Sequence, residues 1–184
     1  MAKEKTEKFI NRAFTNMLTN TLRNHYTLNQ MVDRKARILL TINVVVLSFI
    51  IGKVIGNQFD YSLNFLVLLG GGIACVISIV YSVLAVMPEN NTQNLTEETL
   101  KTGELNPLYF GNYLSMSLES YESTMMEMVD DLRFPHRAML KDLYFIGSIL
   151  ERKRKYLRYS LITMTVGICG SLVLSIILRF VAIG

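Results

Sequence analysis

The sequence predicts an all-α membrane protein in which three transmembrane helices are continuous with a cytoplasmic helical bundle. Just over half of the 184 residues are hydrophobic, and only 18% are charged, whereas a typical soluble domain carries about a quarter. The charge is also uneven, because three long segments hold almost none of it. The remaining segments carry apolar residues at helical spacing, which is typical of amphipathic helices.

The three weakly charged segments are each long enough to cross a bilayer, which takes about 20 apolar residues in a helix. They are residues 38–56, 61–88 and 159–178. Lys53 lies near the end of the first segment, where its long side chain can reach the headgroups. Each segment has a buried soluble helix as its alternative. Three such helices would need a much larger soluble body around them, so we predict three membrane spans.

The distribution of basic residues predicts the orientation, because Lys and Arg accumulate in cytoplasmic loops. Residues 1–37 hold eight Lys or Arg and residues 89–158 hold nine, whereas the short loop 53–60 holds one. Arg179 is the one basic residue after the third span. We therefore expect a multi-pass protein with residues 1–37 and 89–158 in the cytoplasm and the C-terminus outside.

The N-terminal segment is predicted to form one long amphipathic helix. No Pro or Gly interrupts the chain from Lys3 to Ile51, so this helix should run unbroken into the first span. Apolar residues step by four along one face of it: Ile10, Phe14, Leu18, Leu22 and Tyr26.

A heptad pattern predicts the partner of that helix. Residues 114–132 carry apolar residues (Leu114, Leu118, Tyr121, Met125, Met128 and Leu132) at alternating spacings of four and three, and Pro135 breaks the pattern. The pattern resumes at Met139, then passes over the basic cluster 152–155 to Leu157 and Leu161. A further long helix should therefore enter the third span without a break, and pack against the N-terminal helix.

Small residues predict close packing between the spans. Gly167, Ser171 and Ser175 recur every four residues on the third span, and Gly70 and Ala74 do so on the second. Such stripes let membrane helices approach closely, within one chain or between copies.

Enzymatic signals are nearly absent from the sequence. His25 and His136 are the only histidines, and neither has the spacing of a metal ligand to Cys, Asp or another His. The chain has no phosphate-binding glycine loop and no nucleophile elbow. We therefore predict a protein that is not an enzyme and holds no metal. Mixing of acids with bases argues against nucleic-acid binding.

A polar face on the N-terminal helix is the strongest candidate for a site. His25, Asn29, Asp33 and Asn43 fall near one face, and Asn43 lies inside the first span, where a polar side chain usually has a partner. Asp142, Tyr144 and the basic cluster lie at a similar depth on the other long helix. These groups either bond the helices together or bind an anionic ligand such as a nucleotide phosphate. Spacing alone favours the first interpretation.

The sequence has two stretches that carry a family resemblance. One is LRNHYTLNQMVDRKARILLTIN at 22–43, and the other runs from LYFGNYLSMSLESYESTMMEMVDD through KDLYFIGSILERKRKYLR at 108–158. Their most specific features are Asp33, Lys35, Ala36 and Asn43 at the helix entry, the FGN of 110–112 and the DLY of 142–144. Together they resemble the Pycsar transmembrane effector family of bacteria, across essentially the whole chain.

The resemblance implies a role in antiphage defence at the bacterial inner membrane. In Pycsar systems a pyrimidine cyclase makes cCMP or cUMP on infection, and the membrane effector then impairs the inner membrane, which gives abortive infection. The membrane module is also found fused to HD domains, but this sequence contains no HD domain and no separate nucleotide-binding fold. Direct sensing would therefore fall to the helical cytoplasmic region.

The resemblance also implies the ligand and partners. We expect cCMP or cUMP as the activating ligand, no other cofactor, a partner pyrimidine cyclase, the lipid bilayer and a homo-oligomer, since three spans cannot enclose an aqueous pore alone. Lys and Arg would hold the phosphate, whereas Asn, Asp and Tyr would read the base or ribose, or brace the helices. The residues expected to bind the ligand are Arg23, Asn24, His25, Asp33, Lys35, Asn112, Asp142, Tyr144, Lys153 and Arg158.

Two other functions compete with this one. A non-catalytic membrane scaffold or oligomerisation module would use the helical seams alone, with no ligand. A small channel or transporter would normally place an acid or base at the centre of a span, and none of the three spans has one.

Overall fold

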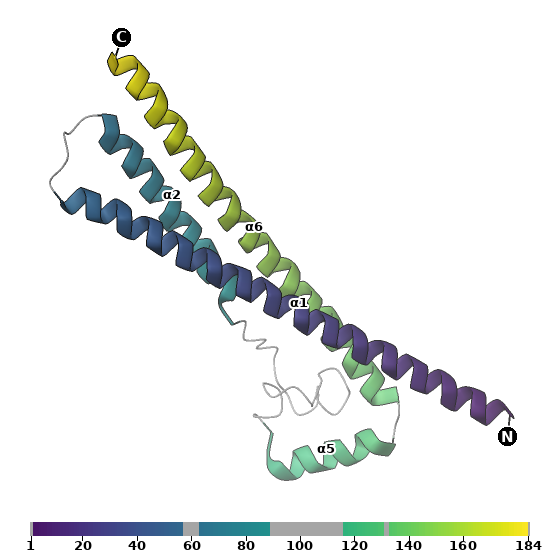
Figure 1. The fold of residues 1–184 in the computed structure, drawn as a ribbon. Helices are drawn as coiled ribbons and strands as arrows, with labels where there is room; N and C mark the ends of the chain where they lie inside the picture. Colours follow the sequence, from purple (N-terminus) through teal and green to yellow (C-terminus); the bar gives the residue numbers. More distant parts are fainter. Residues whose placement is uncertain (1, 57–62, 89–115, 131–132, 184) are drawn as a thin grey trace. The chain divides into compact units, whose positions relative to one another are not determined.

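The computed structural model describes most of the chain and confirms the predicted fold class. The residues it describes are 2–56, 63–88, 116–130 and 133–183. Within these ranges the chain is almost entirely helical, and no strand occurs in them. Figure 1 shows the helices, which are α1 (Ala2–Ile55), α2 (Leu63–Val86), α5 (Leu118–Asp130) and α6 (Arg133–Ile183).

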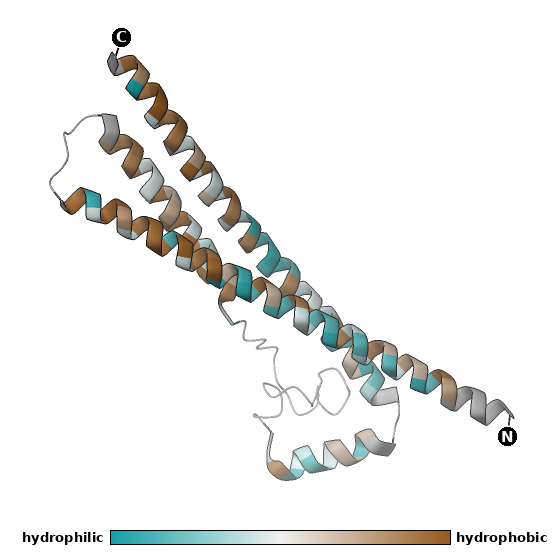
Figure 2. Ribbon diagram, viewed as in Figure 1, coloured by the Kyte–Doolittle hydropathy of each residue, from teal (hydrophilic) through white to brown (hydrophobic). Residues whose placement is uncertain are grey.

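Three of these helices, α1, α2 and α6, are long and apolar enough to cross a membrane. Figure 2 shows that α2 is apolar along its length, whereas α1 and α6 change from mixed to apolar. Both long helices cover a predicted polar segment and a predicted span without interruption, as the lack of internal Pro and Gly in α1 predicts. The chain is therefore a multi-pass, all-helical membrane protein.

The break in the helical pattern that was predicted at Pro135 lies a few residues before this proline. α5 ends at Asp130 and α6 begins at Arg133, so Pro135 lies in the first turn of α6. Proline is tolerated there because the first turn of a helix needs no backbone N–H.

The chain divides into two compact units. The first unit comprises Met1–Leu28 and Pro88–Leu150, and the second, here called the membrane unit, comprises Asn29–Met87 and Glu151–Gly184. Each unit is described separately below.

In the first unit, the N-terminal part of α1 packs against α6 as predicted. The hydroxyl of Thr15 lies 2.8 Å from Nε2 of His136, and the ring of Phe14 meets the same imidazole edge to face at 5.2 Å. Leu18 is 2% exposed, but Ile10 and Tyr26, from the same predicted row, are exposed. A step of four residues turns about 40° past a full helical turn, so the two ends of the row point away from the packed face.

The predicted seam on α5 is only partly correct. Met128 is buried as expected. Leu118 of the predicted seam is exposed, however, and Thr124, which is not part of that seam, is buried. Leu114 and Leu132 lie outside the described residues. The packed face of α5 is therefore rotated relative to the predicted seam.

The seam on α6 continues through the basic cluster instead of passing over it. Lys153 and Ser160 are buried, whereas Leu161 is exposed. The spacing from Leu150 to Lys153, Leu157 and Ser160 alternates three and four, so the heptad continues with polar residues in it. The prediction was wrong here because it was based on apolar residues alone, and the buried positions 153 and 160 carry a lysine and a serine.

In the membrane unit, small residues bring α2 and α6 together. A Cβ added to Gly167 would overlap that of Ala74, and a Cβ on Gly71 would lie 3.7 Å from that of Ser171. The predicted stripe is confirmed for Gly167, Ser171 and Ala74. Gly70 makes no such contact within the chain, since a Cβ there would have no described atom within 4 Å. Packing of Gly70 between copies stays a prediction.

Candidate functional site

Asn43 is a buried polar residue within the apolar part of α1. Its side chain is fully buried. Its amide nitrogen donates to the carbonyl of Leu39 and to the hydroxyl of Ser78 on α2, both at 2.9 Å. The prediction that a polar side chain in the first span has a partner is therefore confirmed.

Three buried serines extend this contact to α6. Ser78 donates to the carbonyl of Ser160 at 2.9 Å, and Ser160 donates to that of Ser78 at the same distance. Ser82 lies one turn beyond Ser78, with its hydroxyl 2.7 Å from that of Ser160. Together with Asn43, these serines form one polar cluster (Asn43, Ser78, Ser82, Ser160) that joins all three spans.

The polar cluster consists of neutral groups, so it stabilises helix contacts and offers no acid or base for catalysis. Side chains in it are fully buried, and such hydrogen bonds between membrane helices favour one arrangement of the helices over others. The sequence analysis identified Asn43 but missed the serines. A signal was available, since Ser78 and Ser82 are four residues apart in an otherwise apolar segment.

Two residues predicted to bind the ligand, Asp33 and Lys153, form an ion pair with each other. The Lys153 ammonium on α6 lies 2.8 Å from Oδ1 of Asp33 on α1. The side chains are 7% and 23% exposed, respectively. A charge this deeply buried requires a partner, so the pair explains how a lysine occupies the α6 seam. For these two residues the geometry favours the helix-bonding interpretation.

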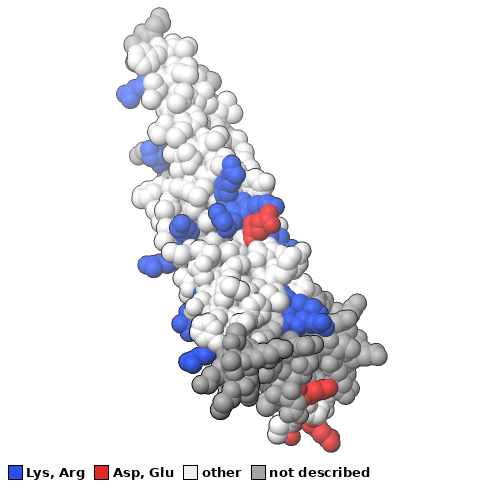
Figure 3. Space-filling model, turned by 90° about the vertical axis from the view of Figure 1, so that its right-hand side faces the viewer, with Lys and Arg blue, Asp and Glu red and all other residues white. Residues whose placement is uncertain are grey.

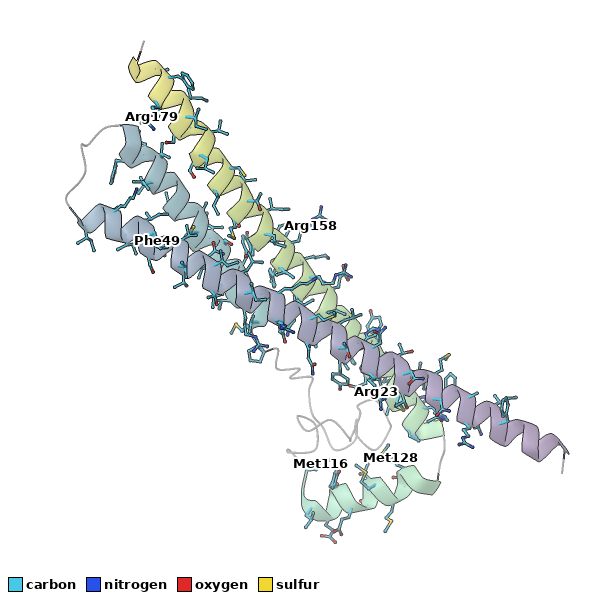
Figure 4. All side chains as sticks on the ribbon, in the orientation of Figure 1. Arg23, Phe49, Met116, Met128, Arg158 and Arg179 are labelled. Atoms are coloured by element: carbon cyan, nitrogen blue, oxygen red, sulfur yellow. The ribbon has the colours of Figure 1, made fainter. Side chains whose placement is uncertain are left out.

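The other predicted ligand residues of the membrane unit, Lys35 and Arg158, are exposed. Figure 4 shows Arg158 extending away from α6. Both side chains can reach a ligand without any rearrangement of the packed core.

In the first unit, His25 is the most enclosed predicted residue. Its Cε1 lies 3.6 Å from where a Cβ of Gly147 would be, so the glycine makes room for the imidazole. Its Nδ1 is buried and has no hydrogen-bond partner among the described residues. Arg23 and Asn24 are exposed on α1, Asp142 is half-buried, and Tyr144 is 76% exposed. Asn112 lies outside the described residues.

The described residues predicted to bind the ligand are distributed over both units. Within the membrane unit, Asp33 and Lys153 form an ion pair. In the described ranges, no group of three His, Cys, Asp or Glu residues could hold a metal ion.

A hollow beside α1 is a feature that the sequence analysis missed. Its volume is about 680 Å³. Its described lining comes from one stripe of α1: Gln30, Arg34, Arg37, Ile38 and Thr41. Figure 3 shows several Lys and Arg side chains, with acidic atoms among them, around the middle of the visible face.

These features define an integral membrane protein whose three spans are joined by buried polar groups, and two of whose helices, α1 and α6, extend beyond the spans as amphipathic segments. A family model described as the Pycsar effector protein domain matches residues 16–181. The chain therefore belongs to the Pycsar effector family, as the two resembling stretches predicted. Neither the curated proteins nor the solved structures contain a match to it.

Proposed function

We propose that this Pycsar antiphage effector senses a cyclic pyrimidine mononucleotide, cCMP or cUMP, and responds by impairing the inner membrane of the infected cell. The observation that carries the proposal is the family match over residues 16–181, which includes all three spans and most of both long helices. The nucleotide would come from a partner cyclase. Residues 1–37 and 89–158 would then face the cytoplasm, where the nucleotide is made, and the outcome would be abortive infection.

The packing of the membrane unit supports a mechanism in which damage requires the spans to rearrange. The polar cluster joins α1, α2 and α6 through buried hydrogen bonds, so opening a path between these helices would require breaking them. Apolar side chains such as Phe49 and Val166 are exposed on the spans, where lipid or a second copy would cover them. We therefore propose that nucleotide binding loosens the three spans and that the loosened copies assemble in the membrane.

The energies are compatible with this mechanism. Four hydrogen bonds of the polar cluster run between helices, and each is worth about 0.6 kcal/mol in a membrane. The polar cluster then contributes on the order of 2 kcal/mol. A ligand with micromolar affinity binds with about 8 kcal/mol, so a modest preference for the loosened state is enough to shift the equilibrium.

Lys35 and Arg158 provide the sharpest test of the predicted ligand residues, because both are exposed. We expect the double variant Lys35→Ala/Arg158→Ala to lose toxicity in cells that make the nucleotide, while inserting in the membrane as the wild type does. Toxicity at the wild-type level, with equal insertion, would remove both residues from the site.

Dye leakage tests the proposed function directly. Liposomes carrying the purified full-length protein are loaded with a self-quenching dye and exposed to cCMP, cUMP or cAMP. Leakage with a cyclic pyrimidine nucleotide and not with cAMP is the expected result. Absence of leakage with all three would contradict sensing and damage by this chain alone.

A membrane scaffold is the second candidate function. The Asp33–Lys153 pair favours it, because two predicted ligand residues already satisfy each other. A scaffold would bind no nucleotide and would leave the liposomes intact, so the same assay separates the two functions.

A further inference from the structure

The hollow beside α1 lies on the opposite side of this helix from its packed face. At about 100° per residue, the stripe Gln30, Arg34, Arg37, Thr41 points roughly 180° away from the stripe Val32, Ala36, Leu39, Asn43. The second stripe is buried, and Asn43 in it bonds to α2. The hollow is therefore accessible to a ligand without separating α1 from α2 and α6.

Two arginines dominate the chemistry of the hollow. Arg34 and Arg37 are exposed and one turn apart, and neither has an acidic partner in the part of the chain that the structure describes. Nε of Arg37 donates to the carbonyl of Asp33 at 3.3 Å, which leaves the terminal nitrogens of its guanidinium for a ligand. Planar guanidinium groups match the oxygens of a phosphate and can bind them in pairs.

The remaining lining residues fit a ligand that is larger than a bare phosphate. Gln30 adds amide donors, and the Thr41 hydroxyl adds a lone pair, because its proton is donated to the carbonyl of Arg37 at 3.0 Å. Ile38 is exposed and supplies an apolar wall. The hollow is open to its surroundings, and its volume of about 680 Å³ leaves room for groups attached to a phosphate.

The position of the two arginines in the sequence further limits which classes of ligand fit the hollow. They immediately precede the apolar part of α1, where a basic side chain meets lipid headgroups. We propose that Arg34 and Arg37 form a binding site for a singly charged phosphodiester, with Gln30, Ile38 and Thr41 contacting the groups attached to the phosphate. Phosphatidylglycerol and a cyclic nucleotide both present this chemistry. For the nucleotide, the inference rests on the proposed function and adds Arg34 and Arg37 to its ligand residues.

The test measures binding of two phosphodiesters to the full-length protein in phosphatidylcholine nanodiscs. One series titrates fluorescent cCMP and cUMP, and the other increases the fraction of a fluorescent phosphatidylglycerol. The variant Arg34→Gln/Arg37→Gln is compared with Arg12→Gln/Arg137→Gln, which removes the same charge from exposed positions of the first unit. Arg34→Gln alone is the second variant, should the double variant fail to insert.

We expect the Arg34/Arg37 variant to bind at least one phosphodiester at least about tenfold more weakly than wild type, since two charge-assisted contacts are lost. The control variant should stay within about twofold, because Arg12 and Arg137 lie outside the lining. Equal binding by wild type and the Arg34/Arg37 variant, or wild-type protein that binds neither phosphodiester, would overturn the inference.

The two series also separate this inference from the proposed function. Arginine-dependent binding of phosphatidylglycerol, with no nucleotide binding by wild type, supports the phosphodiester site and contradicts sensing by this chain. If wild type and the Arg34/Arg37 variant bind the nucleotide equally well, and also bind the lipid equally well, the result contradicts the phosphodiester site and supports nucleotide sensing by this chain.

Discussion

The first unit and the membrane unit hold their helices together by different means. In the first unit, apolar side chains such as Leu18, Ala138 and Leu150 are buried. The membrane unit also buries apolar side chains, such as Val32 and Leu39, but in addition it fully buries the polar side chains of Asn43, Ser78, Ser82 and Ser160. Water drives apolar groups together, but lipid tails do not, so helices in a membrane rely on small residues and hydrogen bonds. The difference between the cores agrees with the different solvents expected around the two units.

This difference predicts that different kinds of substitution destabilise the two units. Truncating an apolar side chain should damage the first unit most. Enlarging a small residue or removing a hydroxyl should damage the membrane unit most.

The largest effect is expected from Leu18→Ala. Truncating a buried leucine costs about 3 kcal/mol, so amide hydrogen exchange in the surrounding part of α1 should accelerate by about 100-fold. The matched control is Ile10→Ala on the same helix, since Ile10 is exposed. Similar exchange rates in the two variants would show that Leu18 does not anchor the first unit.

The next effect is expected from Gly167→Ala. Its new methyl group would overlap the side chain of Ala74, and overpacking of this kind costs about 2 kcal/mol. Reversible unfolding in mixed detergent micelles, followed by circular dichroism, measures the loss. Gly170→Ala is the control, because a Cβ there meets no atom within 4 Å. Equal stability of the two variants would contradict close packing of α2 against α6.

Lys153→Met should cost a similar or slightly smaller amount. It leaves the Asp33 carboxylate without its cation, and breaking a buried pair costs about 3–5 kcal/mol. Asp33 retains some exposure, so we expect about 2 kcal/mol in the same unfolding assay.

The control for the Asp33–Lys153 pair is Lys155→Met. Lys155 lies 2.7 Å from Glu151, in a pair whose side chains are both well exposed, and such pairs contribute about 0.5 kcal/mol or less. The hydrogen bond from Lys155, and secondarily its charge, lowers the pKa of Glu151, but water screens this exposed contact. A Lys153→Met variant as stable as Lys155→Met would show that the Asp33 pair does not brace the membrane unit.

Ser160→Ala should have the smallest effect of the series. It removes the hydroxyl that contacts both Ser78 and Ser82, and each hydrogen bond between membrane helices is worth about 0.6 kcal/mol. We expect a loss of about 1 kcal/mol. Ser48→Ala is the comparison, because the Ser48 hydroxyl bonds only to the carbonyl of Val44 on its own helix, and stability equal to that variant would argue against a role for the polar cluster.

Local patterns were sufficient to predict the fold. Hydropathy predicted three helices long and apolar enough to cross a membrane, and the absence of Pro and Gly predicted that α1 is continuous. The polar face ending at Asn43 was also predictable, because an amide in an apolar segment usually has a partner.

Contacts between distant segments were predictable only in outline, since the sequence indicated bonding between the Asp33 face and the basic cluster but not which residues pair. Lys153 enters the α6 seam only because Asp33 lies across from it, about 120 residues earlier in the sequence. Ser160 is buried in the α6 seam where Leu161 was predicted, because its hydroxyl contacts Ser78 and Ser82 on α2. The hollow at Arg34 and Arg37 was missed because the sequence does not reveal which face of α1 the other helices cover.

The central claim is that nucleotide-induced damage requires α2 and α6 to separate, and a disulfide lock tests it most directly. Cβ atoms at positions 71 and 171 would lie 3.7 Å apart, close to the mean of about 3.8 Å in disulfides. The variant Gly71→Cys/Ser171→Cys is made with Cys75→Ala and Cys169→Ala and reconstituted in dye-loaded liposomes with cCMP or cUMP. We expect the oxidised protein to retain the dye and the reduced protein to release it. Equal leakage before and after reduction would contradict the claim.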